Sequence, residues 1–181
     1  MIDAGRQPLL EMLDAYDWQE EEVIRDRIRR YVASEPRCFE NDCWTGHITG
    51  SAWVLSRDAS HALLILHDKL GKWLQPGGHS DGDPDTRAVA LREAREETGM
   101  TIELDAPGIF DLDIHEIPAR GVQPAHLHLD VRFVVRADMS EPPVRNHETR
   151  DVRWVALADV ERYASEESVL RMVRKSKALS T

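Results

Sequence analysis

Cysteine is scarce in this sequence: Cys38 and Cys43 are the only two among 181 residues. Two cysteines cannot form a four-thiolate metal site or the disulfide framework of a small secreted domain, so we expect two free thiols in a reducing compartment. No apolar run approaches the roughly 20 residues that span a bilayer. The first residues, Met1 to Gly5, lack the basic and then apolar layout of a signal peptide. We therefore expect a cytoplasmic protein without a membrane partner.

Positive charge is also in deficit. The chain has 23 Lys and Arg residues against 33 Asp and Glu residues, for a formal net charge of −10. Nucleic-acid duplexes and anionic membranes are polyanions, so this composition argues against both as partners. A phosphorylated small molecule can still bind such a protein if metal ions or a local basic patch neutralise its charge.

The chain length and the 41% of hydrophobic residues are enough for one substantial core and too small for two domains. Apolar residues recur at helical spacing as far as Pro36, where the pattern stops. We predict an N-terminal helical extension over 1–37 and one domain over 38–181. The extension could pack on that domain or form a homodimer contact. Its apolar residues are Leu9, Leu10, Leu13, Ile24, Ile28, Tyr31 and Val32.

After the extension the hydrophobic period changes from helix to strand. In the clearest strand, 125–135, apolar residues alternate with polar ones, which predicts one face on the core and one polar face. A helix over 86–98, ended by Gly99, separates the second strand from the third. We predict an α/β sandwich, a mixed β-sheet flanked by helices, with a C-terminal helical region over 160–177. The strands are expected at 48–55, 62–67, 101–104, 109–117, 125–135 and 152–157.

Three carboxylates lie on one face of the predicted central helix. Glu93, Glu96 and Glu97 stand at i, i+3 and i+4, so their side chains project together. Like charges at this spacing cost a few tenths of a kcal/mol per pair. Arg92 can offset part of the repulsion, but Mg²⁺, which prefers oxygen ligands, compensates it better. The alternative is a solvated acidic stripe. The side chains on the opposite face of the helix are small and apolar, so this face can pack closely on a sheet. They are Ala88, Leu91 and Ala94.

A glycine-rich loop leads into this helix, with the sequence Gln-Pro-Gly-Gly-His-Ser-Asp-Gly-Asp over 75–83. A backbone without Cβ atoms can approach a phosphate or a metal closely, and the helix N-terminus behind it favours negative charge. The fixed distance between the loop and the three glutamates strengthens the prediction of a phosphate and metal site.

At these residues the sequence resembles the Nudix hydrolase family. The family box is a Gly, five residues, a Glu, seven residues and then R-E-U-x-E-E-x-G-U, where U is aliphatic. Gly78 fits the opening Gly, and the resemblance covers 23 of 181 residues. The matching residues of the second part are Arg92, Glu93, Ala94, Glu96, Glu97, Gly99 and Met100.

The sequence departs from the box at one position, where Pro84 replaces the first Glu. The helix can tolerate this change if Asp83 is the N-cap and Pro84 the first helical residue. In the family, that Glu is expected to help fix the arginine at the Arg92 position. Asp81, Asp83 or Asp85 could replace it, and of these we expect Asp85.

The resemblance implies a Nudix-type fold and a metal-dependent hydrolase that cuts a diphosphate linkage in a nucleoside diphosphate derivative or a similar molecule. Glu93, Glu96 and Glu97 would hold Mg²⁺ or Mn²⁺, with the carbonyl of Gly78 as a further candidate ligand. The catalytic set would be Arg92, Glu96 and Glu97, with a general base from the helix or from a later loop. In that loop Glu148 is the candidate, although it could also be an ordinary loop glutamate.

Several residues outside the box could contact the substrate. Lys69 and Lys72 are the nearest cations in sequence, and His79 follows the paired glycines. His126 and His128 share one strand face with Asp130, and three interpretations stay open for that face. They are a second metal site, a polar pocket wall that touches the substrate, and cross-strand hydrogen bonding without a function. The substrate-binding candidates are therefore Lys69, Lys72, His79, His126 and His128.

Two other functions are compatible with such a fold. One is a catalytically weak Nudix-fold domain that binds nucleotides or regulates, because Pro84 breaks the box. The other is an isomerase similar to the isopentenyl diphosphate isomerases, which needs a cysteine in the pocket. Cys38 and Cys43 precede the first predicted strand, which argues against this third possibility.

Overall fold

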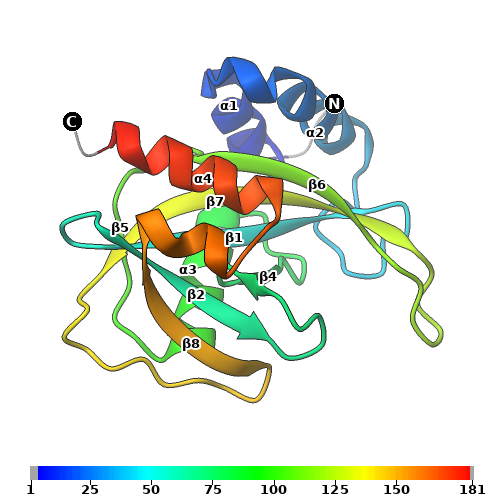
Figure 1. Cartoon of the computed structure of the whole chain (residues 1–181). Helices are drawn as coiled ribbons and strands as arrows, with labels where there is room; N and C mark the ends of the chain where they lie inside the picture. Colours follow the sequence, from blue (N-terminus) through cyan, green and yellow to red (C-terminus); the bar gives the residue numbers. More distant parts are fainter. Residues whose placement is uncertain (1–3, 180–181) are drawn as a thin grey trace.

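A computed structural model describes residues 4–179 as a mixed β-sheet with helices against both faces (Figure 1). The predicted fold class is therefore confirmed, including the N-terminal helices. Residues 1–3, which entered the argument on the signal peptide, lie outside the described residues. The helices are α1 Gln7–Ala15, η1 Gln19–Glu21, α2 Glu22–Ser34, α3 Thr86–Thr98, η2 Leu157–Arg162 and α4 Glu167–Ala178. The strands are β1 His47–Ser56, β2 His61–His67, β3 Trp73–Leu74, β4 Gly77–His79, β5 Glu103–Leu104, β6 Asp111–Ile117, β7 His126–Ala137 and β8 Thr149–Ala156.

The centre of the sheet is a parallel pair, β1 and β7, whose register runs from His47 opposite His128 to Ser56 opposite Ala137. The main path of the sheet is β3-β2-β1-β7-β5, while β4 pairs with β1, β6 with β7 and β8 with β2. The expected hairpin of β1 and β2 exists, but it is short, because β4 pairs with the other part of the same edge of β1 and β3 pairs with β2. The two short strands β3 and β4 were not predicted, since they lie inside the glycine-rich approach to α3.

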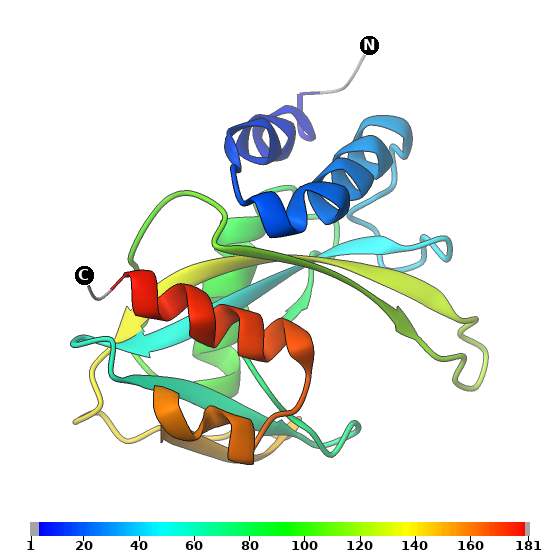
Figure 2. The same cartoon turned by 45° about the horizontal axis from the view of Figure 1, so that its top comes forward.

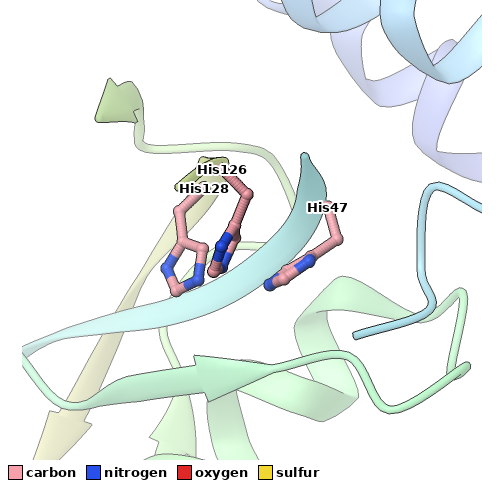
Figure 3. A group of neighbouring side chains, drawn as sticks. All are labelled: His47, His126 and His128. Carbon is pink, nitrogen blue, oxygen red and sulfur yellow. The ribbon is translucent and has the colours of Figure 1, made fainter. Parts of the chain in front are cut away.

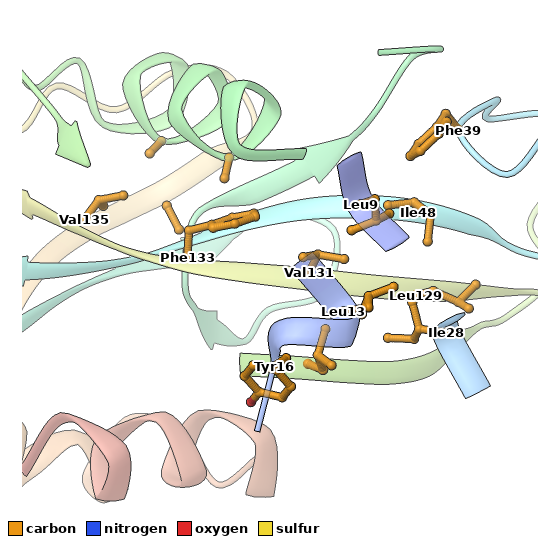
Figure 4. Close-up of a cluster of buried hydrophobic side chains, with 14 of the residues drawn as sticks. Leu9, Leu13, Tyr16, Ile28, Phe39, Ile48, Leu129, Val131, Phe133 and Val135 are labelled. Carbon is orange, nitrogen blue, oxygen red and sulfur yellow. The ribbon is translucent and has the colours of Figure 1, made fainter. Parts of the chain in front are cut away.

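Two apolar clusters fill the space on either side of this sheet. One joins α3 and the N-terminal helices to β1 and β7, and contains Leu9, Leu13, Ile28 and Phe133 (Figure 4). The other joins α4 and η2 to the opposite face, around Trp53. The N-terminal helices thus pack on the sheet of their own chain (Figure 2). The boundary between 1–37 and 38–181 stays a prediction.

The alternation along β7 predicted a polar face, and the structure shows that this face is buried at Asp130 and Arg132. Asp130 and Arg132 are each only 2% exposed. Helix α4 covers this side of the sheet, as Arg171 on α4 bonds Asp111 on the neighbouring strand β6 with its Nε at 2.9 Å. The charges are tolerated there because each has a partner: Arg132 donates to Asp130 at 2.7 Å and to Asp111 at 3.1 Å.

This buried polar network also ties the N-terminal segment to the C-terminal helix. Lys175 of α4 donates to Tyr16 at 2.7 Å and to Asp111 at 2.9 Å, and it forms an ion pair with Glu21. Tyr16 in turn donates to Glu21 at 2.6 Å, and the N–H of Leu112 donates to the same carboxylate at 2.8 Å. The pKa of Asp111 is lowered: burial opposes this, but the hydrogen bond from Arg171 and the neighbouring cations prevail.

None of the helices within residues 4–179 combines the length and the apolar composition needed to cross a membrane.

We predict that Glu21→Gln lowers the free energy of unfolding by about 3 kcal/mol, because it removes one partner from a buried network of charges. Urea denaturation at neutral pH measures the difference. Glu20→Gln is the matched control, since Glu20 is exposed in the same short helix and should change stability by less than about 0.5 kcal/mol. Equal effects of the two substitutions would contradict a structural role for the network.

Candidate active site

Helix α3 spans the predicted residues, but its N-cap is different. Asp85 caps the helix, accepting hydrogen bonds from the N–H groups of Arg87 at 3.1 Å and of the following residue at 3.2 Å. The prediction of Asp83 as cap with Pro84 as the first helical residue is wrong, because the helix starts later and Asp83 accepts from the N–H of Asp85 at 2.9 Å. Gly99 ends the helix with a φ of 65°, as predicted.

The face of α3 that packs on the sheet matches the expected one in part. Of the three residues expected there, Ala94 is buried and Leu91 packs against the core, but Ala88 is exposed, and the buried face also includes Val89 and Glu97. Gly50 of β1 makes the close contact possible, because a Cβ there would lie 2.7 Å from a backbone carbonyl of the first turn of α3. The close packing turns one of the three glutamates toward the protein interior.

Glu97 is that buried glutamate, with only 4% of its surface exposed. Its carboxylate accepts a hydrogen bond from the N–H of Gly77 at 2.9 Å. Burial raises the pKa of Glu97 to about 8, and the nearby carboxylates Glu93, Glu148 and Glu96 add to the increase, whereas the Gly77 N–H works against it. Without a cation nearby, burial therefore favours the protonated form of this carboxyl.

Glu93 lies directly against the opening glycine of the box. A Cβ on Gly78 would overlap the Glu93 carboxylate, so any other residue here would force the Glu93 side chain to move. Burial raises the pKa of Glu93; the hydrogen bond and the charge of Arg92 oppose the increase, and Glu96 adds to it. Glu96, the third member, is exposed. The three carboxyls thus range from buried to open around the start of the glycine-rich loop.

Arg92 links α3 to this loop. Its Nη2 donates to the carbonyl of His79 at 2.8 Å and to Glu93 at 3.0 Å. The acidic residue that faces it across the loop is Asp81, at 3.7 Å. We expected Asp85 to replace the missing box glutamate, and this is wrong, since Asp85 is used as the helix cap and lies 3.6 Å from Arg87.

The loop before β8 brings Glu148 close to the helix. Glu148 contributes to the raised pKa of Glu97, so the two carboxyls interact although they lie far apart in sequence. Lys69 lies 3.8 Å from Glu148, whereas the ammonium of Lys72 pairs with Glu166 at 2.8 Å. Of the two predicted cations, the structure places Lys69 beside the carboxylate cluster and Lys72 with the start of α4.

The predicted histidines lie together, but Asp130 does not join them. The rings of His79 and His128 are 5.1 Å apart and those of His126 and His128 are 5.4 Å apart. Asp130 accepts hydrogen bonds from Thr49 and Ser51 instead. Sequence reasoning missed His47, whose ring centroid lies within 5.1 Å of those of His79, His126 and His128. Figure 3 shows His47 beside His126 and His128. Only the pairing of β1 with β7 brings it there.

The cysteines are unsuited to the isomerase alternative. Cys38 is fully buried in the apolar cluster, and burial raises the pKa of its thiol to about 12. Cys43 is buried as well, and its sulfur lies 3.4 Å from the hydroxyl of Tyr31. Neither thiol is an accessible, activated nucleophile or acid.

The carboxylate cluster suits a hard divalent cation. Carboxylate oxygens are the preferred ligands of Mg²⁺ and Mn²⁺. Burying Glu93 and Glu97 beside other carboxyls is unfavourable without a cation, as their raised pKa values indicate. The residues present therefore fit a divalent cation, which Glu93, Glu96 and Glu97 would hold.

Solved structures share this fold. The chain is similar to an Ap4A hydrolase from C. elegans (TM-score 0.59, 18% identity, covering 73% of this chain and 96% of that one). It is also similar to a NUDIX-family hydrolase from Clostridium perfringens (TM-score 0.55, 24% identity, 74% and 97%). A third similar structure is the NUDIX domain of Shewanella oneidensis NrtR in complex with ADP ribose (TM-score 0.50, 20% identity, 84% and 97%).

The family model described as the NUDIX domain matches residues 47–175, which is most of the chain and includes the whole box. The resemblance seen in the sequence is thereby confirmed, and membership supports the predicted pyrophosphohydrolase as the class of enzyme. This chain belongs to the NUDIX domain family.

Proposed function

We propose that this protein hydrolyses the diphosphate linkage of a nucleoside diphosphate derivative or a similar phosphorylated small molecule, with Mg²⁺ or Mn²⁺ as cofactor. The observation that carries the proposal is the position of Glu97. It is buried, bonded to the glycine-rich loop and surrounded by three further carboxyls. A solvated acidic stripe, the alternative weighed for the three glutamates, would leave all of them exposed.

Glu93, Glu96 and Glu97 are the proposed metal ligands, with the carbonyl of Gly78 as a further candidate. A bound divalent cation supplies positive charge to the diphosphate oxygens and makes a nearby water more acidic. Arg92 keeps the ligands in place, because it bonds both Glu93 and the carbonyl of His79. The helix and the loop are therefore held in one arrangement before the substrate arrives.

Glu148 is the proposed general base, with Glu97 as the candidate on the helix. In the reaction, water attacks one phosphorus, the bond from that phosphorus to the bridging oxygen breaks, and the base takes the proton of the water. Glu148 is half exposed and lies beside Lys69, so it can reach solvent as well as the cluster. Burial among other carboxyls suits Glu97 to hold a proton or a metal.

The substrate would lie over the glycine-rich loop, beside Lys69 and His79. Lys69 is the proposed contact for a phosphate, whereas Lys72 would first have to leave Glu166. His126 and His128 belong to the histidine group next to His79, which supports a place near the same substrate. Which group leaves with the second phosphate is set by the loops outside the box.

A nucleotide-binding domain with weak catalysis is the second candidate, and one observation favours it. Pro84 occupies the position of a box glutamate, and Arg92 is faced at 3.7 Å by Asp81 instead. Tight nucleotide binding without turnover would favour this function. A homodimer formed through the N-terminal helices and a cytoplasmic location also stay predictions.

We predict that Glu97→Gln lowers turnover more than about 100-fold, because loss of a direct metal ligand should exceed the 10- to 100-fold cost of losing a supporting partner. The assay uses a panel of nucleoside triphosphates, dinucleoside polyphosphates, nucleotide sugars and diphosphate lipids with Mg²⁺ or Mn²⁺. Glu103→Gln is the control, since Glu103 is exposed on β5. Full activity in Glu97→Gln would remove Glu97 from the mechanism.

The raised pKa of Glu97 also predicts how stability depends on pH when metals are removed. The folded protein holds this proton up to about pH 8, while the unfolded chain loses it near pH 4.5. Stability in chelator should therefore fall as pH rises through this window, by a few kcal/mol. Urea denaturation of the wild type and of Glu97→Gln measures the effect. An identical pH profile for both proteins would contradict it.

A further inference from the structure

Five histidines gather at the end of the sheet where β1, β7 and β6 run side by side. His47 on β1 and His115 on β6 are both the register partners of His128 on the central strand β7. His126 lies two residues before His128 and so on the same face of β7. His79, on β4, completes the group, since its ring lies 5.1 Å from those of His47 and His128. The strand pairing therefore brings four separate chain segments to one point.

Three of these side chains present ring nitrogens to one another (Figure 3). One ligand atom from each of His47, His126 and His128 lies within 4.8 Å of the other two. Imidazole nitrogens around a tetrahedral Zn²⁺ are about 3.3 Å apart, as follows from bonds of about 2.05 Å. The ring nitrogens would therefore have to approach one another by up to about 1.5 Å to share one ion.

The hydrogen bonding of the three rings leaves lone pairs free for a cation. The Nδ1 of His126 lies 2.9 Å from the carbonyl of Pro124, which can only accept, so this nitrogen carries the proton and Nε2 carries the lone pair. Nε2 of His128 is buried without a hydrogen-bond partner among the described residues, and neither nitrogen of His47 has a partner with good hydrogen-bond geometry there, although the backbone of Cys43 lies near its ring. Buried nitrogens without partners are costly, and a metal ion would satisfy them.

We propose that His47, His126 and His128 form a second metal site, separate from the carboxylate cluster, for a divalent transition metal ion such as Zn²⁺. Imidazole nitrogens suit Zn²⁺ and its neighbours in the transition series, whereas the carboxylates of α3 suit Mg²⁺ and Mn²⁺. Three protein ligands leave the fourth tetrahedral position open, and His79 is the nearest further ring on the loop side. This proposal is independent of the hydrolase activity.

Metal titration of the purified full chain, after removal of metals with a chelator, tests the site. We expect one equivalent of Zn²⁺ to bind by calorimetry, and one equivalent of Co²⁺ to give visible absorption bands that Zn²⁺ abolishes by displacement. In His47→Gln/His128→Gln the affinity for Zn²⁺ should fall at least about 100-fold. His61→Gln is the matched control, because His61 bonds Ser60 at the start of β2, and it should leave the titration unchanged.

Two further measurements distinguish Zn²⁺ binding at the histidines from binding at the carboxylate cluster, and they distinguish a lost ligand from a misfolded variant. Glu93→Gln/Glu97→Gln should keep the stoichiometric Zn²⁺ and the Co²⁺ spectrum. In the wild type, nitrogen-15 spectra of the rings should show Zn²⁺ shifting Nε2 of His126 while Nδ1 stays protonated. The proposal is overturned if no stoichiometric Zn²⁺ binds, if Nε2 of His126 does not respond, or if binding survives the loss of the histidines and disappears with the glutamates.

Discussion

The site depends on one buried carboxyl being held against a backbone N–H group. Glu97 reaches the N–H of Gly77 because β4 lies unusually close to β1: a Cβ on Gly77 would be 2.8 Å from the Cα of Ser51. Gly50, which lies on β1 itself, lets α3 pack closely on that strand. The glycines therefore set how far the carboxyl is withdrawn from water, and burial in turn raises its pKa and makes a cation the favoured partner.

The same sheet carries a buried chain of charges from the C-terminal helix to the glycine-rich loop. Lys175 bonds Asp111, Arg132 joins Asp111 to Asp130, and Asp130 also accepts from Gln75 at 3.5 Å, two residues before Gly77. Such groups are costly to bury and favour one arrangement in which all of them are paired. The helices of both chain ends thus contribute to the position of the loop that bonds Glu97.

Much of the fold and of the candidate site could be predicted from local sequence patterns. The features that could not be predicted depend on contacts between distant segments of the chain. The helix over 86–98 was predictable because Gly99 and the box spacing are local. The cap on Asp85 was missed because a proline fits the first turn equally well in sequence. The alternation in β7 indicated a strand but not that its polar face is covered by α4. His47 reaches its neighbours only through strand pairing, so no spacing could reveal it, whereas Glu148 was named from the family resemblance and not from a spacing.

The fold thus places two kinds of ligand near one loop, oxygens on α3 and nitrogens on β1 and β7. The central claim concerns the oxygens, and Mn²⁺ bound in the presence of a non-hydrolysable diphosphate analogue tests it most directly. Electron paramagnetic resonance of this complex should show stoichiometric Mn²⁺ coupled to phosphorus, and Glu93→Gln/Glu97→Gln should lose both the binding and the coupling. Mn²⁺ bound with the same affinity and the same phosphorus coupling in that variant would contradict the account.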